Sequence, residues 1–483
     1  MMNPAWREAL RRIEDLELIE DPVRRKVYES DGLTALAQIP PLVALPSTRA
    51  ALQALLQLCH AHNVPVVARG AGTGLSGGAT PLAEGLLVSL AKFKQILSVD
   101  QARMTARVEP GVTNLAISEA VADLGLFYAP DPSSQIACTI GGNVAENSGG
   151  VHCLKYGLTL HNVCGLTLLL ANGEPLEIGG EGLWEDGLDL LSVMHGSEGL
   201  LGIIVEVIVK LRPQPEAVNV LMAGFDSVEA AANAVSDVIR AGVLPAGLEM
   251  MDQLAIQAAE DFVAAGYPRD AAALLLCELD GTSEEVARTC AEVTSVLKRA
   301  GATSVERASD AVARARLWQG RKAAFPAVGR LAPDYYCMDG TIPRRHLAAV
   351  LAAITEKSDQ YGLRVANVFH AGDGNLHPLI LYDVNDRDQF HRAEAFGADI
   401  LNICLDYGGT ITGEHGVGLE KIDQMCRQFD SVELGAFHAL KSAFDPTGLL
   451  NPGKAIPTLN RCAEFGAMHV HGAPSKFSTL PRF

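Results

Sequence analysis

The sequence predicts an α+β protein of two or three domains. Its 483 residues are enough for several domains, each with a core of its own. Short apolar runs typical of strands alternate along the chain with amphipathic runs typical of helices. The segment Pro213-Gln-Pro215 is the clearest linker, and the pattern of the chain changes beyond it.

The composition excludes several classes of protein. Charged residues make up 20% and hydrophobic residues 48%, which is ordinary for a globular protein and too apolar for a disordered one. A formal net charge of −18 without any stripe of Lys and Arg argues against nucleic-acid binding. No apolar run reaches the roughly 18 residues that a membrane span needs.

The ten cysteines indicate the compartment. They are widely spaced, and no C-x-x-C pair supplies the usual spacing of an iron–sulfur cluster or a zinc ribbon. Cys277 and Cys404 have apolar neighbours, so we expect them to behave as small buried hydrophobes in a reducing environment. The sequence therefore predicts a cytoplasmic protein.

The apolar periodicity predicts the elements before the linker. Helical spacing predicts a helix over residues 5–19, and a second helix begins at Ser47 or Thr48 and ends near His62. The predicted strands cover residues 43–45, 64–68, 85–90, 105–108, 163–170 and 203–211.

Beyond the linker, strands and helices alternate. We predict strands at 220–225 and 272–278 and helices at 227–241 and 283–300, a pattern that indicates an α+β sandwich. After Asn451-Pro-Gly-Lys454 the chain is expected to form an extended arm.

A first glycine-rich segment follows the strand predicted at 64–68. Gly72 to Gly77 matches the G-x-G-x-x-G pattern of dinucleotide-binding domains, but no helix follows, because Pro81, Gly85 and another strand come next. What remains is a run of small side chains whose backbone N–H groups form an anion nest. A flexible hairpin is the alternative.

A second glycine-rich segment is longer. Pro130 to Ser134 precedes Thr139 to Gly150, which holds four glycines and several small or amide residues. We expect this run to form neither a packed helix nor a stiff strand, and to let a large planar ligand approach the backbone. Together the two segments imply a cofactor of dinucleotide size.

Two segments near the C-terminus carry candidate metal ligands. His370-Ala-Gly-Asp-Gly-Asn-Leu-His377 offers two imidazoles on a glycine-rich turn, and Thr412-Gly-Glu414-His415-Gly sets a carboxylate beside a third imidazole. Two neutral His nitrogens and one carboxylate make an open zinc-type site, which leaves the other His for proton chemistry. The alternative is a pair of polar turns whose histidines hydrogen-bond locally.

The motifs before the linker resemble those of a known family. The loop from Arg69 to Gly78, the segment Pro130–Gly150 and the stretch Gly196–Ile204 resemble the FAD-binding domain of vanillyl-alcohol-oxidase-type flavoproteins. The resemblance implies a two-part FAD-binding domain over residues 38–216, after an N-terminal helical region at 1–37.

The later motifs resemble the FAD-linked oxidase C-terminal domain, namely His370–His377, Glu414-His415 and Asn451–Lys454. This implies an α+β substrate and metal domain over residues 217–457, followed by an extended tail at 458–483. Within the family the chain resembles the FAD-linked 2-hydroxy-acid dehydrogenases, a group with the flavin subunit of bacterial glycolate oxidase, D-lactate dehydrogenases and D-2-hydroxyglutarate dehydrogenases. The segments Trp318–Pro326, Tyr335–Arg344 and Met468–Phe483 carry this closer resemblance.

The resemblance implies a role for each candidate residue. The ligands of Zn²⁺ or another divalent metal would be His370, His377 and Glu414. His415 would be the catalytic base, Asn375 would contact the substrate, and Arg321 would clamp the substrate carboxylate with its bidentate fork. The FAD-binding residues would be Arg69, Gly70, Ala71, Gly72, Thr73, Gly74, Ser76, Gly77, Pro130, Ser134, Gly141, Gly142, Asn147, Ser148, Gly150, Ile204 and Asn451.

The resemblance also implies the substrate and the reaction. The 2-hydroxyglutarate enzymes hold their second carboxylate with a threonine and a lysine, where this chain has Phe325 and Cys337. A small monocarboxylate, glycolate or D-lactate, therefore fits better than a diacid. The metal would polarise the substrate hydroxyl, His415 would take its proton, and Cα would pass a hydride to the flavin; removal of the Cα proton by His415 stays open.

Two other functions stay open at this point. A zinc hydrolase would leave both glycine-rich segments without a role, and a non-catalytic flavin-binding scaffold would leave the histidines unexplained. Covalent attachment of FAD, for which His152 and Cys153 are near the second segment, also stays open.

Because the chain offers no internal electron relay, the resemblance implies partners. These would be an iron–sulfur subunit and a second flavoprotein subunit of a glycolate oxidase complex, which would place the chain peripherally at the inner membrane. Residues Ala467–Phe483 are a candidate docking arm, and an inert end is the alternative.

Overall fold

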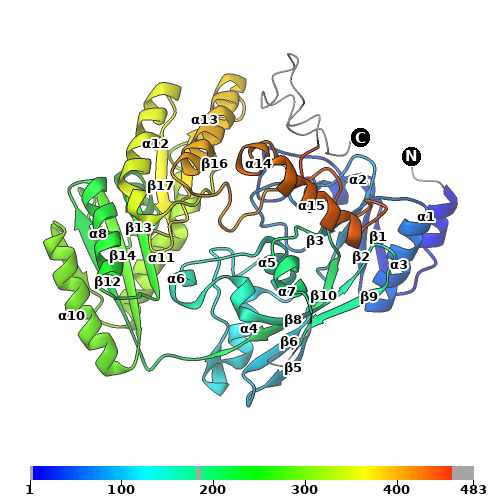
Figure 1. Cartoon of the computed structure of the whole chain (residues 1–483), viewed down its shortest axis with the longest axis horizontal. Coiled ribbons are helices and arrows are strands. Elements are labelled where there is room, and N and C mark those ends of the chain that lie inside the picture. The colour runs from blue at the N-terminus through cyan, green and yellow to red at the C-terminus, as the bar shows by residue number, and fades with distance from the viewer. Residues whose placement is uncertain (1–3, 181–186, 459–483) are drawn as a thin grey trace. The chain divides into compact units, whose positions relative to one another are not determined.

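The protein folds into two compact units, and its computed structural model describes residues 4–180 and 187–458 (Figure 1). Unit 1 comprises residues up to Gly149, Leu158–Pro213 and the segment from Glu414 onward, and unit 2 comprises Gly150–Gly157 and Gln214–Gly413. The change of unit after Pro213 falls at the predicted linker. The units differ from the predicted domains elsewhere, because residues 150–157 pack with unit 2 and residues from Glu414 pack with unit 1. The predicted tail and docking arm lie outside the described residues, apart from position 458.

Unit 1 contains two main sheets. The first has the strand order β1-β2-β4-β3, in which β2 and β3 run parallel to β4. The second is antiparallel, with the order β5-β6-β10-β8-β9. The strands are β1 Leu16–Ile19, β2 Val43–Pro46, β3 Val66–Arg69, β4 Leu86–Ser89, β5 Ile96–Asp100, β6 Thr105–Val108, β7 Leu126–Phe127, β8 Val163–Leu169, β9 Pro175–Gly179, β10 Ile203–Lys210 and β11 Arg212–Pro213. The helices are α1 Pro4–Leu10, α2 Pro22–Lys26, α3 Arg49–Ala61, α4 Asn114–Val121, α5 Ile140–Glu146, α7 Leu190–Met194, α14 Ile422–Gln428 and α15 Ser431–Phe444.

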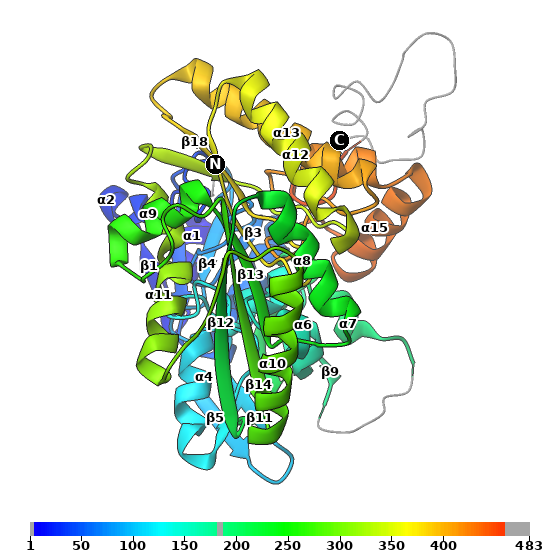
Figure 2. The same ribbon diagram turned by 90° about the vertical axis from the view of Figure 1, so that its left-hand side faces the viewer.

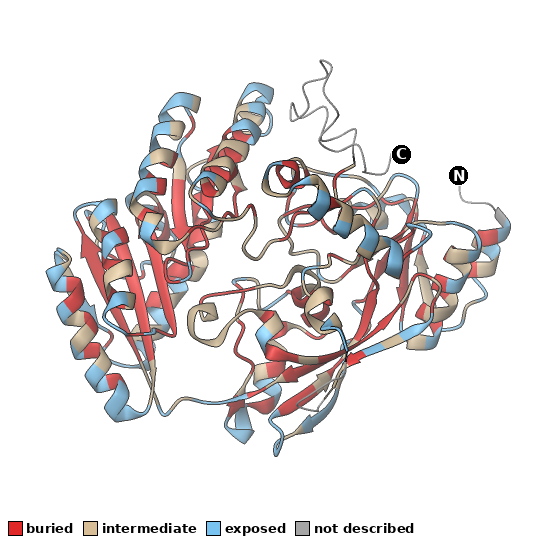
Figure 3. Cartoon of the chain, in the orientation of Figure 1, coloured by how far each residue is buried: buried red, intermediate tan, exposed pale blue. Residues whose placement is uncertain are grey.

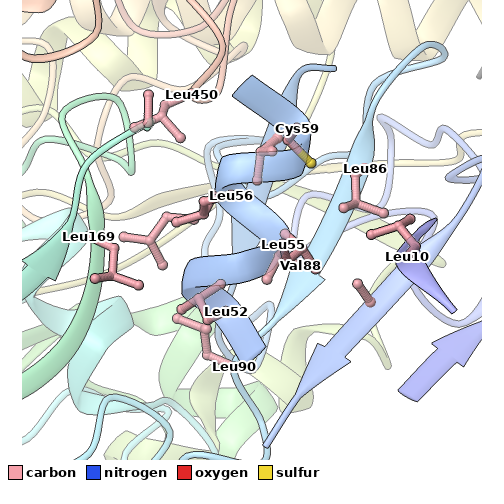
Figure 4. Packing of buried hydrophobic residues seen from close by; sticks show 14 of the residues in the cluster. Leu10, Leu52, Leu55, Leu56, Cys59, Leu86, Val88, Leu90, Leu169 and Leu450 are labelled. Carbon is pink, nitrogen blue, oxygen red and sulfur yellow. The ribbon is translucent and has the colours of Figure 1, made fainter. Parts of the chain in front are cut away.

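Helix α3 shows how unit 1 builds its core. The helix begins as predicted, where Thr48 Oγ1 accepts a hydrogen bond from Ala51 N at 3.2 Å. One face of α3 is fully buried, and Leu55 and Leu56 pack in a cluster that also holds Leu169 from the second sheet and Leu450 from the C-terminal segment (Figure 4). The cluster therefore ties segments far apart in sequence into one unit.

The predicted helix over residues 5–19 is wrong beyond its first half. Helix α1 ends at Leu10, and the chain turns through Asp15, whose φ is 58°, into strand β1. Leu16 pairs with Pro46 of β2, so strand pairing overrides the helical spacing. Ile13 and Leu16 still pack against the core that the spacing predicted.

The prediction that the second glycine-rich segment forms no helix is also wrong. Thr139 Oγ1 accepts a hydrogen bond from Gly142 N at 3.4 Å to begin α5, and Asn147 ends the helix with a φ of 54°. Gly141 lies against Pro110, because a Cβ at this glycine would be 2.6 Å from the Cβ of Pro110. The glycine therefore permits close packing of a helix instead of preventing the helix.

Unit 2 is built on a seven-stranded antiparallel sheet with the order β15-β12-β14-β13-β17-β18-β16, as expected for an α+β sandwich. Helices α8, α10, α12 and α13 pack on one face, and α9 and α11 pack on the other (Figure 2). The strands are β12 Ala217–Phe225, β13 Gly247–Asp252, β14 Ala273–Gly281, β15 Ser304–Arg307, β16 Asp334–Cys337, β17 Val365–Phe369 and β18 Pro378–Tyr382. The helices are α6 Cys153–Tyr156, α8 Val228–Arg240, α9 Gln253–Val263, α10 Ser283–Arg299, α11 Ala311–Val328, α12 Leu347–Tyr361 and α13 Arg387–Asp406.

Coverage on both faces buries the central strands of this sheet (Figure 3). Cys277 and Cys404 are fully buried, as predicted, and burial raises the pKa of each thiol, that of Cys404 to about 12. In the described part of the chain, no helix is long and apolar enough to cross a bilayer.

Two helical glycines provide a test of the packing at α5. We expect Gly141→Ala to lower the free energy of unfolding by about 1–3 kcal/mol, because the new methyl group would overlap Pro110. Gly435→Ala in α15 is the matched control, since a Cβ there meets no atom within 4 Å, and it should raise the free energy of unfolding by about 0.4–1 kcal/mol. Urea denaturation measures both changes, and equal stabilities of the two variants would contradict the packing argument.

Candidate functional site

The first glycine-rich segment of unit 1 carries a run of unused backbone donors. Among the described residues, no group accepts a hydrogen bond from the N–H of any residue from Gly70 to Gly74. Gly72 has a φ of 75°, and a Cβ there would lie 2.1 Å from Arg69 Nη2. Adjacent free N–H groups on such a backbone form an anion nest, which fits the pyrophosphate of FAD.

The side chain of Arg69 is engaged within the protein. Its Nη1 donates to Ser30 O at 2.7 Å, and its guanidinium lies 5.7 Å from the ring centroid of Tyr28. Burial lowers the pKa of Arg69, while the carboxylate of Asp31 acts in the opposite direction. The guanidinium of Arg69 is therefore tied to the segment around Ser30 through Nη1.

The motif from Asn451 to Lys454 holds the end of the same segment. Asn451 Nδ2 donates to Gly78 O at 3.0 Å and to Glu198 O at 2.7 Å, and Lys454 Nζ donates to Gly78 O at 2.8 Å. Burial lowers the pKa of Lys454 to about 8, against the opposing charges of Asp31, Glu198 and Glu146. Sequence reasoning missed this bracing, and FAD contact by Asn451 stays a prediction.

The two glycine-rich segments meet in unit 1. A Cβ at Gly70 would lie 2.4 Å from Thr139 Oγ1, next to the start of α5. Asn147 Oδ1 accepts from Leu160 N at 3.0 Å, which fixes the end of that helix. Unit 1 therefore contains all the predicted FAD-binding residues except Gly150, which belongs to unit 2.

In unit 2, His370 and His377 lie at the two ends of the turn that joins β17 to β18. Their ring centroids are 5.1 Å apart with the ring planes at 87°, and both side chains are buried. His370 N donates to Asn375 O at 3.1 Å, which closes the turn. The antiparallel pairing of β17 with β18 thus places the two imidazoles side by side.

Both histidines use Nδ1 within the protein. His370 Nδ1 lies 2.8 Å and 3.0 Å from the two carboxylate oxygens of Glu249, and His377 Nδ1 lies 3.3 Å from Met338 O. Since these partners only accept hydrogen bonds, we assign the proton to Nδ1 in each ring. Nε2 is then the nitrogen of each ring that can act as a metal ligand, and two neutral imidazoles fit a divalent metal.

Arg321 of α11 is also held by Glu249. Its Nε and Nη2 lie 2.8 Å and 2.7 Å from Glu249 Oε2, and its side chain is fully buried. Arg321 Nη1 and Asn375 Oδ1 are buried without a hydrogen-bond partner in the described chain. Because buried polar atoms are almost always paired, these two atoms indicate a place for a polar ligand.

Glu249 was missed by sequence reasoning. It lies between apolar residues in strand β13, whose other acidic residue is Asp252 at its end, and the strand was itself not predicted. Burial alone would raise the pKa of Glu249, but its interactions with His370 and Arg321 hold the pKa below its ordinary value. An isolated acidic residue in an apolar stretch was the only available signal.

The segment that leads to Glu414 is fixed in unit 2. Asp339 accepts from Thr412 Oγ1 at 2.6 Å and from Gly413 N at 3.0 Å, and a Cβ at Gly413 would be 2.6 Å from the side chain of Asn375. Glu414 comes next and begins the last segment of unit 1, where its Oε2 accepts from Gly149 N at 2.9 Å. His415 follows it in the same unit.

Two family models match the chain: an FAD binding domain over residues 40–179, and the FAD linked oxidases, C-terminal domain, over residues 214–455. The chain is also 59% identical over 468 residues to glycolate oxidase subunit GlcD of Escherichia coli strain K12, covering 97% of this chain and 94% of the relative. The chain belongs to the FAD-linked oxidases. This confirms the predicted family.

Other members of the FAD-linked oxidases are also similar over nearly the whole chain. Glycolate oxidase subunit GlcD of Bacillus subtilis is 41% identical over 457 residues, covering 94% of this chain and 97% of the relative. D-lactate dehydrogenase of Anaerostipes hadrus is 31% identical over 437 residues, covering 88% of this chain and 92% of the relative.

Solved structures share the fold at low sequence identity. p-Cresol methylhydroxylase with substrate bound gives a TM-score of 0.81 at 18% identity, covering 95% of this chain and 98% of its own. 4-Ethylphenol oxidase from Gulosibacter chungangensis gives a TM-score of 0.78 at 17% identity, covering 94% of this chain and 97% of its own. The fold is therefore the predicted one, a vanillyl-alcohol-oxidase-type FAD-binding domain with an FAD-linked oxidase C-terminal domain.

Asn451 offers a test of how the first glycine-rich segment is held. Its φ is 45°, which glycine tolerates, so Asn451→Gly removes the side chain with little backbone strain. The carbonyls of Gly78 and Glu198 each lose a buried donor, and we expect the free energy of unfolding to fall by about 1–3 kcal/mol and less FAD to remain bound. Urea denaturation and flavin absorbance after gel filtration measure these effects, and full FAD retention would contradict the bracing role.

Proposed function

We propose that this chain is a flavin-bearing subunit that oxidises glycolate to glyoxylate, with D-lactate as a second substrate. Relatives with the same domains are glycolate oxidase subunits and D-lactate dehydrogenases. The buried group of Arg321, Asn375, His370 and His377 in unit 2 carries the proposal. A cation, an amide and two buried imidazoles match the carboxylate and the hydroxyl of a 2-hydroxy acid.

Arg321 would bind the substrate carboxylate through Nη1. Because Glu249 lies against the edge formed by Nε and Nη2, the edge formed by Nη1 and Nη2 is the one that would meet the substrate. Asn375, which has an unpaired Oδ1, would contact the substrate beside it. His415 would take the hydroxyl proton as the base.

His370, His377 and Glu414 would hold a divalent metal, for which Zn²⁺ suits the donor set. A metal held there supplies Lewis-acid polarisation. FAD, when bound by the two glycine-rich segments, supplies the two-electron acceptor.

The side chains beside His377 favour a small substrate. The ring centroid of Phe325 lies 6.2 Å from that of His377 and 6.2 Å from that of Tyr335, with edge-on contacts. Cys337 on β16 is buried. Neither Phe325 nor Cys337 could neutralise a second carboxylate, so a monocarboxylate is preferred to a diacid.

An anaerobic spectrum tests the proposed function. Glycolate or D-lactate should bleach the flavin absorbance of the purified protein, while D-2-hydroxyglutarate should leave it unchanged. A colourless protein would favour a zinc hydrolase, and a yellow protein that neither monocarboxylate bleaches would favour a non-catalytic flavin-binding scaffold.

The three histidines should separate metal binding from proton transfer. His370→Ala and His377→Ala should lose bound metal and turnover together, because each removes one of three ligands. His415→Ala should keep FAD and metal but lose turnover by about 10²–10⁴-fold. His391→Ala, at an exposed position, is the control. Elemental analysis measures the bound metal, and steady-state rates measure the turnover of each variant. A fully active wild type without metal would contradict the metal assignment.

The reduced flavin requires an electron acceptor, which we propose to be an iron–sulfur subunit acting with a second flavoprotein subunit. The isolated reduced chain should then react slowly with oxygen and quickly with artificial acceptors. A cysteine-rich partner should co-purify from native lysate, and truncation after Thr458 should weaken its recovery. Fast oxygen turnover without any partner would instead indicate a self-sufficient oxidase.

A further inference from the structure

We propose that Glu249 is a positioning residue that sets both the metal-binding nitrogen of His370 and the substrate-binding nitrogen of Arg321. The inference rests on the proposed function and assigns a role to a residue that contacts neither the substrate nor the metal directly.

Sheet register and helix packing bring the three side chains together. Met250 of β13 pairs with Phe369 of β17, which places Glu249 opposite His370, the next residue after the strand. Arg321 comes from α11, which packs against β17 and α9. The carboxylate is 1% exposed, so its interactions with His370 and Arg321 are shielded from solvent.

The two oxygens of Glu249 act on different partners. Both lie within 3.0 Å of His370 Nδ1, which fixes the ring and keeps the proton on that nitrogen. Oε2 also accepts a hydrogen bond from Arg321 Nε and lies 2.7 Å from Nη2, so the end of the guanidinium that carries Nη1 points away from Glu249 and has no hydrogen-bond partner among the described residues. A carboxylate behind a ligating histidine orients the ring and strengthens the donor on its far side.

The cation of Arg321 balances the charge of Glu249. The pair is neutral overall, so His370 does not need to be protonated to satisfy the buried carboxylate. One ion pair therefore permits a neutral ligand histidine and an oriented arginine at the same place.

A second glutamate in the same sheet supplies a matched control. Glu278 of β14 lies 2.9 Å from His152 Nε2 and accepts a hydrogen bond from Trp318 Nε1, and Trp318 lies on α11 one turn before Arg321. Glu278 thus anchors the same helix and contacts a histidine, but among the described residues it forms no hydrogen bond or ion pair with His370 or Arg321. Substitution of Glu278 should perturb the packing of α11 without changing the orientation of His370 Nε2 or Arg321 Nη1.

The experiment compares Glu249→Gln, Glu249→Asp and Glu278→Gln in the FAD-bound protein. Zn²⁺ affinity is measured by competition with a chelator after metal removal, and KM and kcat are measured with glycolate. Glu249→Gln should weaken Zn²⁺ binding by about 10–100-fold and raise KM more than it lowers kcat. Glu249→Asp, which keeps the charge, should recover part of the Zn²⁺ affinity and part of the KM. Glu278→Gln should match the wild type in Zn²⁺ affinity and in KM, while its thermal stability should fall.

Equal Zn²⁺ affinity and equal KM in Glu249→Gln and Glu278→Gln would overturn the proposal and leave Glu249 with a structural role. If Glu249→Gln fails to fold, Glu249→Asp decides, because a shortened carboxylate must still change both quantities. A wild type that glycolate and D-lactate do not bleach would refute the proposed function, while the Zn²⁺ comparison would still judge Glu249. If the substrates bleach the wild type but it has no affinity for Zn²⁺, the proposed effect of Glu249 on His370 is overturned. The KM for glycolate then tests the proposed effect of Glu249 on Arg321.

Discussion

The buried ion pair between Glu249 and Arg321 is the constraint on which unit 2 depends. It joins strand β13 to helix α11 and, through His370, to the turn after β17. Removing one member of such a pair leaves an uncompensated buried charge, at a cost of about 3–5 kcal/mol. The same carboxylate contacts His370 and Arg321, the two groups that we propose to meet the metal and the substrate carboxylate.

In unit 1, side chains at both ends hold the first glycine-rich segment in place while the N–H groups of Gly70 to Gly74 stay unpaired among the described residues. Gly78 O, at the end of the first glycine-rich segment, accepts from both Asn451 and Lys454. Arg69 holds the start of the segment through Ser30 O. With both ends fixed by side chains, the N–H groups between them stay available for an anion.

The sequence predicted the elements whose signals are local. Helix α3 has an N-cap threonine and an apolar face, and strand β14 is a continuous apolar run between turn residues, so both were found. Helix α1 was predicted too long because the pairing of Leu16 with β2 is a tertiary effect. The helix in the second glycine-rich segment was missed because Gly141 is there for its contact with Pro110.

The candidate site divides in the same way. His370 and His377 are close in sequence and lie on one turn, so their pairing could be predicted from the motif. Glu249 lies 72 positions from Arg321 and 121 positions from His370, and no spacing rule links them. The engaged edge of Arg321 follows from Glu249 and was missed for the same reason.

Anomalous diffraction at the zinc edge, from crystals of the FAD-bound protein grown with Zn²⁺, tests the central claim most directly. The account predicts one peak about 2.0–2.1 Å from Nε2 of both His370 and His377, with Nδ1 of His370 still bonded to Glu249. A peak at Nδ1 of either ring, or no peak beside these histidines, would contradict it.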